Sequence, residues 1–236
     1  MWNPSIRKFK ELHIFQNTQG ILGVDMTSGF GYDSFTDNYK VVVVLQYFIH
    51  GKAYKTEVKV HTLGTNSWKS IQECPLGVLS MQQSGKFVSH KIHWLASIDD
   101  EWKIPCFTVS FDLGNESYKK VLPPDYGDIH ACNLALSVLR DCLCLVTCHD
   151  IWVMTDYGIQ ESWTKLFTFS NMPDPAKSYS LTKAISAFED GQVLLEYVEN
   201  QKKNVGVYDS KNDTLKLTMF QQTLEASVES LISPCF

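Results

Sequence analysis

The stretch VHTLGTNSW, Val60 to Trp68, sets the pattern from which the fold can be predicted. Apolar and polar residues alternate over Glu57 to His61, where this stretch begins, as in a half-buried β-strand. Gly64, Thr65 and Asn66 follow, and glycine and asparagine tolerate the positive φ angles of tight turns. A large aromatic residue then closes the stretch. We therefore predict a β-hairpin whose second strand begins at the aromatic residue.

Weaker copies of this pattern recur along the chain. The copies span residues 2–9, 111–118, 154–163 and 207–215, and the anchor residues of the five units are Phe9, Trp68, Tyr118, Trp163 and Leu215. Propeller blades repeat at a similar spacing of about 40–50 residues. Helical repeats would need amphipathic helices, and the best candidates, 134–139 and 223–231, are short. We expect one all-β domain over 1–236, a propeller-like (kelch-like) array of about five four-stranded units that forms an incomplete propeller.

Other turns are predicted from glycine and proline. Gly29-Phe30-Gly31 is interpreted as a turn that leads into the buried strand Val41–Leu45, because it lacks the third glycine and the helix of a phosphate-binding loop. Further hairpin turns and inter-unit loops are expected at Gly114-Asn115, Glu189-Asp190-Gly191, Pro123-Pro124-Asp125 and Pro173-Asp174-Pro175.

Composition narrows the class of protein. Hydrophobic residues make up 44% of the chain, enough for a large core, and the formal net charge of −5 with a pI near 5.8 argues against nucleic acid as the main partner. No apolar run is long enough to span a bilayer, and the N-terminus lacks the pattern of a signal peptide. Seven cysteines, an odd number, favour reduced thiols. We expect a cytoplasmic or nuclear protein.

Several motifs in chain order resemble the F-box-associated domain of plant F-box proteins. They are WNPSIR (2–7), GFGYD (29–33), DNYKVV (37–42), LGTNSWK (63–69), HWLA (93–96), SFDL (110–113), LCL (143–145), IWVM through YG to ESWTK (151–165) and ESL (229–231). The resemblance implies a protein-recognition module of the kelch-type ubiquitin ligase receptors. In that family the domain selects the protein to be ubiquitylated, and a preceding F-box docks on the Skp adaptor of a cullin-based ligase.

The chain departs from that pattern in two places. No F-box-like segment precedes Trp2, so we expect an N-terminally truncated domain that would meet the Skp adaptor and cullin only if an F-box is present elsewhere. A truncated array can leave a sheet edge unpaired, which would favour self-association. Ser89-His90-Lys91 also replaces the family's Asn-Gly turn, and a type I′ turn there would place bulky residues at positive φ.

Some residues could carry chemistry, but a structural interpretation fits each of them better. Cys142, Cys144, Cys148 and His149, with His130 and Cys132, could be zinc ligands, but Cys-Leu-Cys lies in an apolar strand, where both thiols face one side. The acidic pairs Asp99-Asp100 and Glu189-Asp190 resemble solvated turns more than glycosidase carboxylates. We expect no enzyme activity, no catalytic residues, no cofactor and no metal. The alternatives are a carbohydrate- or small-ligand-binding propeller and, last, a propeller hydrolase.

Partner binding is expected in loops rather than in the motif residues. Trp102 lies in a charged segment and resembles an interface anchor, whereas the other tryptophans lie in repeat or motif positions that favour core packing. The candidate partner-binding residues are Trp102, Tyr47, Tyr54 and Tyr126, in or near the candidate loops 46–55, 98–104, 125–130 and 172–177. The partner is expected to be a protein rather than a nucleic acid or a membrane.

Overall fold

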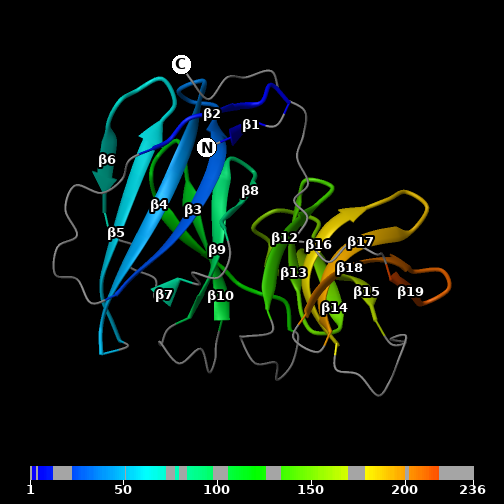
Figure 1. Cartoon of the computed structure of the whole chain (residues 1–236). Coiled ribbons are helices and arrows are strands. Elements are labelled where there is room, and N and C mark those ends of the chain that lie inside the picture. Colours follow the sequence, from blue (N-terminus) through cyan, green and yellow to red (C-terminus); the bar gives the residue numbers. More distant parts are fainter. Residues whose placement is uncertain are drawn as a thin grey trace.

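The strands of the protein form four antiparallel sheets and one short hairpin (Figure 1). The computed structural model describes residues 2–3, 5–12, 23–50, 52–72, 78–79, 84–97, 106–125, 134–169, 179–199 and 202–217. Within these ranges no helix is long and apolar enough to cross a membrane. The chain passes through the four sheets in sequence order, so they are called sheets 1 to 4 below.

Sheets 1, 3 and 4 are meanders of consecutive strands, and sheet 2 departs from this pattern at β7 and β8. Sheet 1 contains β3 (Val24–Asp33), β4 (Asn38–Ile49), β5 (Lys52–Thr62) and β6 (Trp68–Ile71). In sheet 2, β7 (Val78–Leu79) and β8 (Lys86–Val88) both pair with β9 (Lys91–Ser97), followed by β10 (Cys106–Asp112) and β11 (Tyr118–Val121). Sheet 3 contains β12 (Ala135–Leu139), β13 (Cys142–Val146), β14 (Asp150–Met154) and β15 (Trp163–Thr168), with the 3-10 helix η2 (Gln160–Ser162) before β15. Sheet 4 contains β16 (Tyr179–Ala187), β17 (Gln192–Glu199), β18 (Lys202–Asp209) and β19 (Thr214–Leu217).

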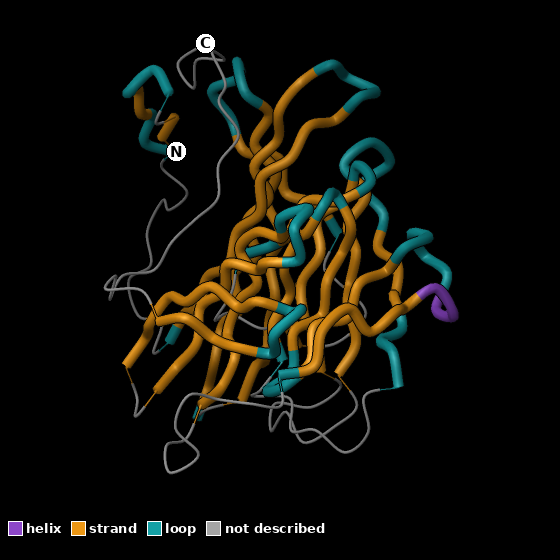
Figure 2. Tube along the Cα trace, turned by 90° about the vertical axis from the view of Figure 1, so that its right-hand side faces the viewer, coloured by secondary structure: helices purple, strands orange, loops and turns teal. Residues whose placement is uncertain are grey.

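The sheets follow one another as the blades of a propeller do. β3 contacts β8, β8 contacts β12, and β12 contacts β16, so one early strand of each sheet lies next to an early strand of the following sheet. Separate hydrophobic clusters fill the spaces between sheets 1 and 2, 2 and 3, and 3 and 4. The remaining strands, β1 (Trp2–Asn3) and β2 (Lys8–Phe9), form a hairpin that lies apart from the four sheets in Figure 2. The predicted propeller-like all-β architecture is confirmed, with four sheets and one partial unit.

The sequence repeat corresponds to a repeated cross-strand pair. In the four sheets the anchor lies at or next to the start of the last strand, opposite a residue of the strand before it; the pairs are His61–Trp68, Phe111–Tyr118, Met154–Trp163 and Tyr208–Leu215. In the short hairpin, Phe9 ends β2 and pairs with Trp2. Trp163 and Leu215 are buried, whereas Phe9 is 66% exposed. Each copy of the repeat therefore contains a cross-strand pair, but the anchor of the hairpin is not buried.

A repeated hydrogen bond joins each sheet to the one before it. An aromatic side chain at the anchor pair donates to a backbone carbonyl at the end of the preceding sheet's last strand. The bonds run from Tyr118 Oη to Gln72 O (3.0 Å), from Trp163 Nε1 to Leu122 O (2.9 Å) and from Tyr208 Oη to Thr168 O (3.2 Å). In sheet 4 the anchor is a leucine, which has no donor, and the tyrosine opposite it supplies the bond.

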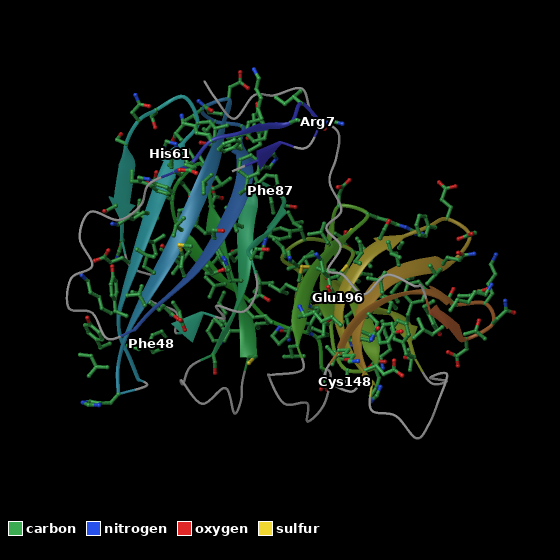
Figure 3. The ribbon with its side chains drawn as sticks, viewed as in Figure 1. Arg7, Phe48, His61, Phe87, Cys148 and Glu196 are labelled. Carbon is green, nitrogen blue, oxygen red and sulfur yellow. The ribbon has the colours of Figure 1, made fainter. Side chains whose placement is uncertain are left out.

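The Gly29-Phe30-Gly31 segment lies inside strand β3, so its interpretation as a turn is wrong. A Cβ on Gly29 would lie 2.3 Å from Ile92 Cγ2, and one on Gly31 would lie 2.3 Å from Phe87 Cδ2. Phe87 belongs to β8 of sheet 2 (Figure 3). The two glycines are needed because β3 and the side chains of β8 and β9 approach too closely for a further side chain.

A buried ion pair ties the same motif to sheet 2. Lys40 Nζ lies 2.7 Å from Asp33 Oδ2 and donates to the Leu113 carbonyl at 2.8 Å, and the two side chains are 7% and 1% exposed. Burial alone would raise the pKa of Asp33, but hydrogen bonds from Lys40, Thr36 and the Phe35 N–H hold it below its ordinary value. The charged residues of this family-like motif are therefore structural.

Two hairpins turn through two consecutive residues with positive φ, none of which is glycine or asparagine. Ser89 and His90 have φ of 49° and 61° between β8 and β9, and Arg140 and Asp141 have 49° and 60° between β12 and β13. The expected type I′ turn at Ser89-His90 is thus present, with both central residues strained.

The remaining predicted turns differ in detail. The predicted turns at Gly64 and Gly191 contain the expected positive φ, whereas in the turn at Gly114-Asn115 the positive φ falls on Glu116. Residues 122–125 connect sheets 2 and 3 without strand structure, as expected for Pro123-Pro124-Asp125. The helix candidate at 134–139 is strand β12, and the candidate at 223–231 and the loop at 173–175 lie outside the described residues.

Candidate functional site

The structure brings together two of the four predicted partner-binding residues. Tyr47 in β4 and Tyr54 in β5 have ring centroids 6.3 Å apart. Tyr47 is only 7% exposed, and its hydroxyl donates to Glu57 Oε2 at 3.1 Å, whereas Tyr54 is 54% exposed. Burial, with the bond to Glu57, raises the pKa of Tyr47 above its ordinary value. Of this pair, Tyr54 offers the larger surface to a partner.

The candidate loops are described only in part. Residues 46–55 were expected to form a loop, and this is wrong for most of the segment, because β4 extends to Ile49 and β5 begins at Lys52. The ladder between these strands shifts its register once, at a β-bulge between Tyr47 and Phe48. The remaining sites, Trp102 and Tyr126 with 98–104, 126–130 and 172–177, lie outside the described residues.

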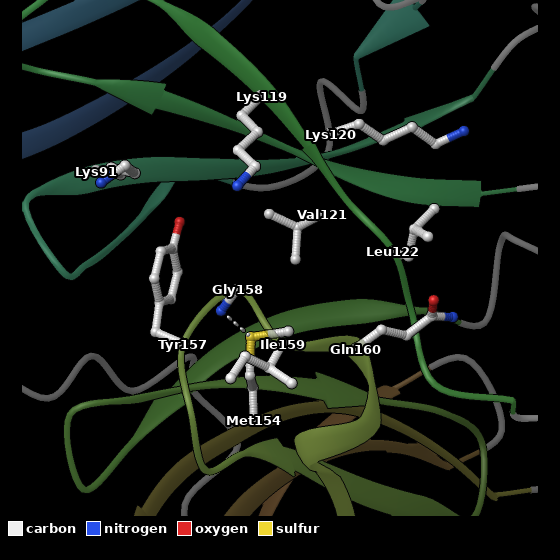
Figure 4. Close-up of a pocket in the computed structure, with 10 residues that line it drawn as sticks. All are labelled: Lys91, Lys119, Lys120, Val121, Leu122, Met154, Tyr157, Gly158, Ile159 and Gln160. Atoms are coloured by element: carbon white, nitrogen blue, oxygen red, sulfur yellow. Dashed lines mark hydrogen bonds between the residues drawn. The ribbon is translucent and has the colours of Figure 1, made fainter.

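A groove in the described part of the chain lies between sheets 2 and 3 (Figure 4). It has a volume of about 350 Å3 and lies between β11 and the turn that connects β14 to η2. It is lined by Lys91, Lys119, Lys120, Val121, Leu122, Met154, Tyr157, Gly158, Ile159 and Gln160. We call it the inter-sheet groove.

Strand geometry decides which lysines point into the inter-sheet groove. Lys119 and Val121 are two residues apart in β11 and share a face, and Val121 packs in the cluster between sheets 2 and 3. Lys120 faces the other way, with its Nζ 4.2 Å from the centroid of the Phe107 ring. Figure 4 shows the Lys119 ammonium directed toward Tyr157 and the Lys120 ammonium directed away. The Lys119 side chain therefore places a positive charge in the groove, whereas Lys120 lines it mainly with backbone atoms.

Lys91 brings a second ammonium to the inter-sheet groove. Its Nζ lies 3.2 Å from Asp112 Oδ2 and 5.5 Å from the centroid of the Tyr157 ring. Burial alone would raise the pKa of Asp112, but N–H donors from Asn115 and Gly114, together with Lys91, hold it below its ordinary value. Asp112 stays ionised and offsets part of the Lys91 charge.

The wall of the inter-sheet groove is held by a buried histidine. His93 is fully buried; its Nε2 lies 2.7 Å from Tyr157 Oη and its Nδ1 lies 3.0 Å from the Lys86 carbonyl. Burial lowers the pKa of His93 to about 4. The neutral ring therefore donates a hydrogen bond from Nδ1 to the Lys86 carbonyl, and its Nε2 accepts a hydrogen bond from the Tyr157 hydroxyl. This bond joins sheet 2 to sheet 3 and fixes the tyrosine that flanks the lysines.

The opposite rim of the inter-sheet groove is apolar. Leu122 is 45% exposed and Ile159 is 52% exposed, and they lie on the two sides of the groove. Between them, the side-chain amide of Gln160 donates to the Pro123 carbonyl at 3.1 Å, which fixes the turn against the end of β11. The groove thus combines a cationic part with an exposed aliphatic part.

The arrangement offers little for catalysis. The residues that line the inter-sheet groove include neither a carboxylate nor a thiol, so the convergent acids of a glycosidase are missing there. Glu189 and Asp190 lie in an exposed turn before β17, as expected, and Asp99-Asp100 lies outside the described residues.

The cysteines behave as packing residues. Cys144 is fully buried in β13, and burial raises the pKa of its thiol to about 12. Across the described ranges no three His, Cys, Asp or Glu side chains group as a metal site would require. His130 and Cys132 lie outside those ranges.

A second hollow of about 330 Å3 lies beside β3 and is lined by Leu12, Ser28, Gly29, Phe30, Val41, Ser84 and Gly85. Phe30 is 45% exposed and stacks on Tyr39 with centroids 5.3 Å apart. Sugar-binding sites combine such aromatics with paired amides, and none of these lining residues is an asparagine or a glutamine. The inter-sheet groove is therefore the better site.

The fold and the groove together define a class of protein. Antiparallel sheets arranged in sequence order, with neighbouring sheets in contact and hydrophobic clusters between them, characterise a β-propeller-like protein. The inter-sheet groove, with its lysine side chains, lies at the surface between two of these sheets. A surface groove of this kind is typical of a binding module.

The chain belongs to the F-box associated beta propeller domain family, which it matches over residues 1–232. It is similar to the F-box protein CPR1 of Arabidopsis thaliana, with 29% identity over 88% of this chain and 56% of that protein. It is similar also to the F-box/kelch-repeat protein At3g23880 of the same plant, with 30% identity over 90% of this chain and 56% of that protein. The chain thus spans a little over half the length of these relatives.

Among solved structures, the chain is similar to TolB from Acinetobacter baumannii, with a TM-score of 0.41 and 11% identity. The similarity covers 84% of this chain and 56% of that chain.

Sequence reasoning did not predict the inter-sheet groove. Lys119 follows an anchor residue in an outer strand, and Tyr157 and Ile159 follow β14 in a family-like motif that was assigned to framework. The alternation in Tyr118-Lys119-Lys120-Val121 could have separated the two lysines by face, but it does not say which sheet lies opposite. Only the packing of sheet 2 against sheet 3 brings Lys119 to Tyr157.

Proposed function

We propose that this chain is the protein-recognition part of an F-box-type ubiquitin ligase receptor, which binds the protein to be ubiquitylated. The family match over residues 1–232 carries the proposal, since the relatives are F-box proteins. The inter-sheet groove supports it, because its cationic and aliphatic parts suit a protein surface better than a reaction centre. Catalysis of ubiquitin transfer falls to other subunits, and the chain acts in the cytoplasm or the nucleus.

Coupling to the ligase requires an F-box joined to this chain. Under the proposal, the Skp adaptor and the cullin contact that F-box, while the propeller-like domain contacts only the client. The outer strands β6, β11, β15 and β19 each pair with one strand in their sheets, and an edge of this kind could also pair with a second copy of the chain.

Affinity capture from plant extract tests this function. The chain is presented once alone and once joined to the F-box of a relative, and bound proteins are identified for both. We expect the same client proteins on both baits and the Skp adaptor only on the bait with an F-box. A client that binds should then be ubiquitylated when ligase components and the F-box fusion are added. Recovery of the adaptor on the chain alone would contradict this division of roles.

A further inference from the structure

We propose that the inter-sheet groove binds a carboxylate-rich peptide segment of the partner protein, with an apolar side chain of that segment placed against Leu122 and Ile159. This inference rests on the proposed function and specifies the chemistry of the partner. The chain carries a formal net charge of −5, yet the ammonium groups of Lys91 and Lys119 face the groove and its lining holds no acidic residue. The local charge is therefore opposite in sign to that of the whole chain.

Lys119 carries the electrostatic part of the proposal. No carboxylate among the described residues forms an ion pair with it, and its ammonium points into the inter-sheet groove. Lys91 adds a second ammonium that Asp112 only partly offsets, because the carboxylate lies 3.2 Å away on one side while the Tyr157 ring lies on another. Two separated ammonium groups suit successive carboxylates along an extended chain.

An acidic protein segment suits the inter-sheet groove better than a nucleic acid does. Nucleic acid, with its dense row of phosphates, would meet the negative net charge of the rest of the chain. A partner protein can present a short acidic segment to the groove while the rest of its surface carries little negative charge, so repulsion from the rest of this chain is small.

The apolar rim and the fixed tyrosine supply specificity. Leu122 and Ile159 are about half exposed, and an apolar side chain between them would be removed from water at the centre of the contact. Tyr157 is held by His93 at 2.7 Å, so the wall of the inter-sheet groove is ordered before a ligand arrives. The expected ligand is an apolar residue flanked by aspartates and glutamates.

Fluorescence anisotropy with defined peptides tests this inference on the full chain. The probe is fluorescein-labelled GSDEDLDEDSG, and its uncharged counterpart is GSNQNLNQNSG. We expect the acidic probe to bind at about 50 mM NaCl and to weaken severalfold at about 300 mM, because salt screens exposed charges. The uncharged counterpart should bind at least tenfold more weakly.

Two charge reversals form a matched pair. K119E and K120E each replace one lysine of β11 by glutamate and take the formal net charge from −5 to −7. K119E should weaken the acidic probe at least tenfold, whereas K120E should weaken it less than threefold, because its ammonium lies over Phe107 outside the inter-sheet groove. Circular dichroism and the thermal midpoint show whether both variants remain folded.

A second pair tests the apolar contact. I159S should weaken GSDEDLDEDSG about fivefold, which corresponds to roughly 1 kcal/mol, and should leave GSDEDGDEDSG, which lacks the leucine, unchanged. K119E should weaken both acidic peptides. This pattern would show that the leucine of the peptide lies near Ile159 and that the carboxylates of the peptide lie near Lys119.

Three outcomes would overturn the inference. They are no binding of the acidic probe at low salt, equal losses in K119E and K120E, or binding of a ten-nucleotide thymidine strand with the same sensitivity to K119E. The proposed function has its own test, and it is contradicted if the plant-extract capture recovers no client. If clients bind K119E as tightly as they bind the wild type, the proposed recognition function stands and the inter-sheet groove is excluded as the binding site.

Discussion

Acidification should weaken the contact between sheets 2 and 3 through His93. In the folded protein His93 is buried and has a pKa of about 4, while its ordinary value of 6.5 applies once the chain unfolds. The unfolded chain therefore binds a proton that the folded chain excludes, so the free energy of unfolding falls as the pH decreases. The stabilisation is complete above pH 6.5 and is lost progressively between pH 6.5 and 4.

The size of this effect follows from the difference between the folded and unfolded pKa values of His93. A tenfold change in proton affinity corresponds to about 1.4 kcal/mol, so the total loss below pH 4 is about 3 kcal/mol, and about 2 kcal/mol is already lost at pH 5. Other groups titrate as well, but the carboxyl groups with lowered pKa values, such as Asp33 and Asp112, protonate mainly below pH 4. The window from pH 6.5 to 5 is therefore the most informative.

Urea unfolding of the wild type and of H93Q at pH 8, 6.5 and 5 measures this effect. H93Q removes the titrating ring and keeps a polar side chain, so it should be less stable than the wild type at pH 8. Between pH 8 and 5 the wild type should lose about 2 kcal/mol more than H93Q does. An equal loss in both proteins would refute the assignment of this pH dependence to His93.

Three further predictions concern the packing of the sheets, each measured by urea or thermal unfolding. H90G should stabilise the protein by about 1 kcal/mol, because glycine removes the cost of positive φ in the β8–β9 turn, and a loss would show that the imidazole contributes more than the strain. G29A should cost about 1–3 kcal/mol through its clash with Ile92, whereas G23A, whose nearest neighbour lies at 3.8 Å, should be nearly neutral. K40A should cost about 3–5 kcal/mol because it leaves Asp33 charged and buried, and the double change K40M with D33N should recover most of that loss. A K40A protein as stable as the wild type would exclude a structural role for the ion pair.

The spacing of the anchors allowed much of the fold to be predicted from sequence. Trp68, Tyr118 and Trp163 each begin the last strand of a sheet, because a strand–turn–strand unit is specified by residues close together in the chain. Its turn chemistry and its alternation are local, and a single sequence records both.

The positions that depend on contact between sheets were not predicted. Gly29 and Gly31 suggest a turn when only their neighbours in sequence are considered, yet they lie inside β3 because Ile92 and Phe87 of sheet 2 occupy the space of a side chain. Phe9 has the sequence pattern of the other anchors but is 66% exposed. Lys119 likewise becomes a groove residue only because sheet 3 places Tyr157 opposite it.

Protein recognition by this chain is tested most directly by the affinity of a purified client. A protein recovered in the plant-extract capture would be purified and titrated by calorimetry against the wild type, K119E and K120E. We expect direct one-to-one binding that K119E weakens at least tenfold and K120E leaves nearly unchanged. If no recovered protein binds the purified chain, the chain is not a protein-recognition module and the central claim is wrong.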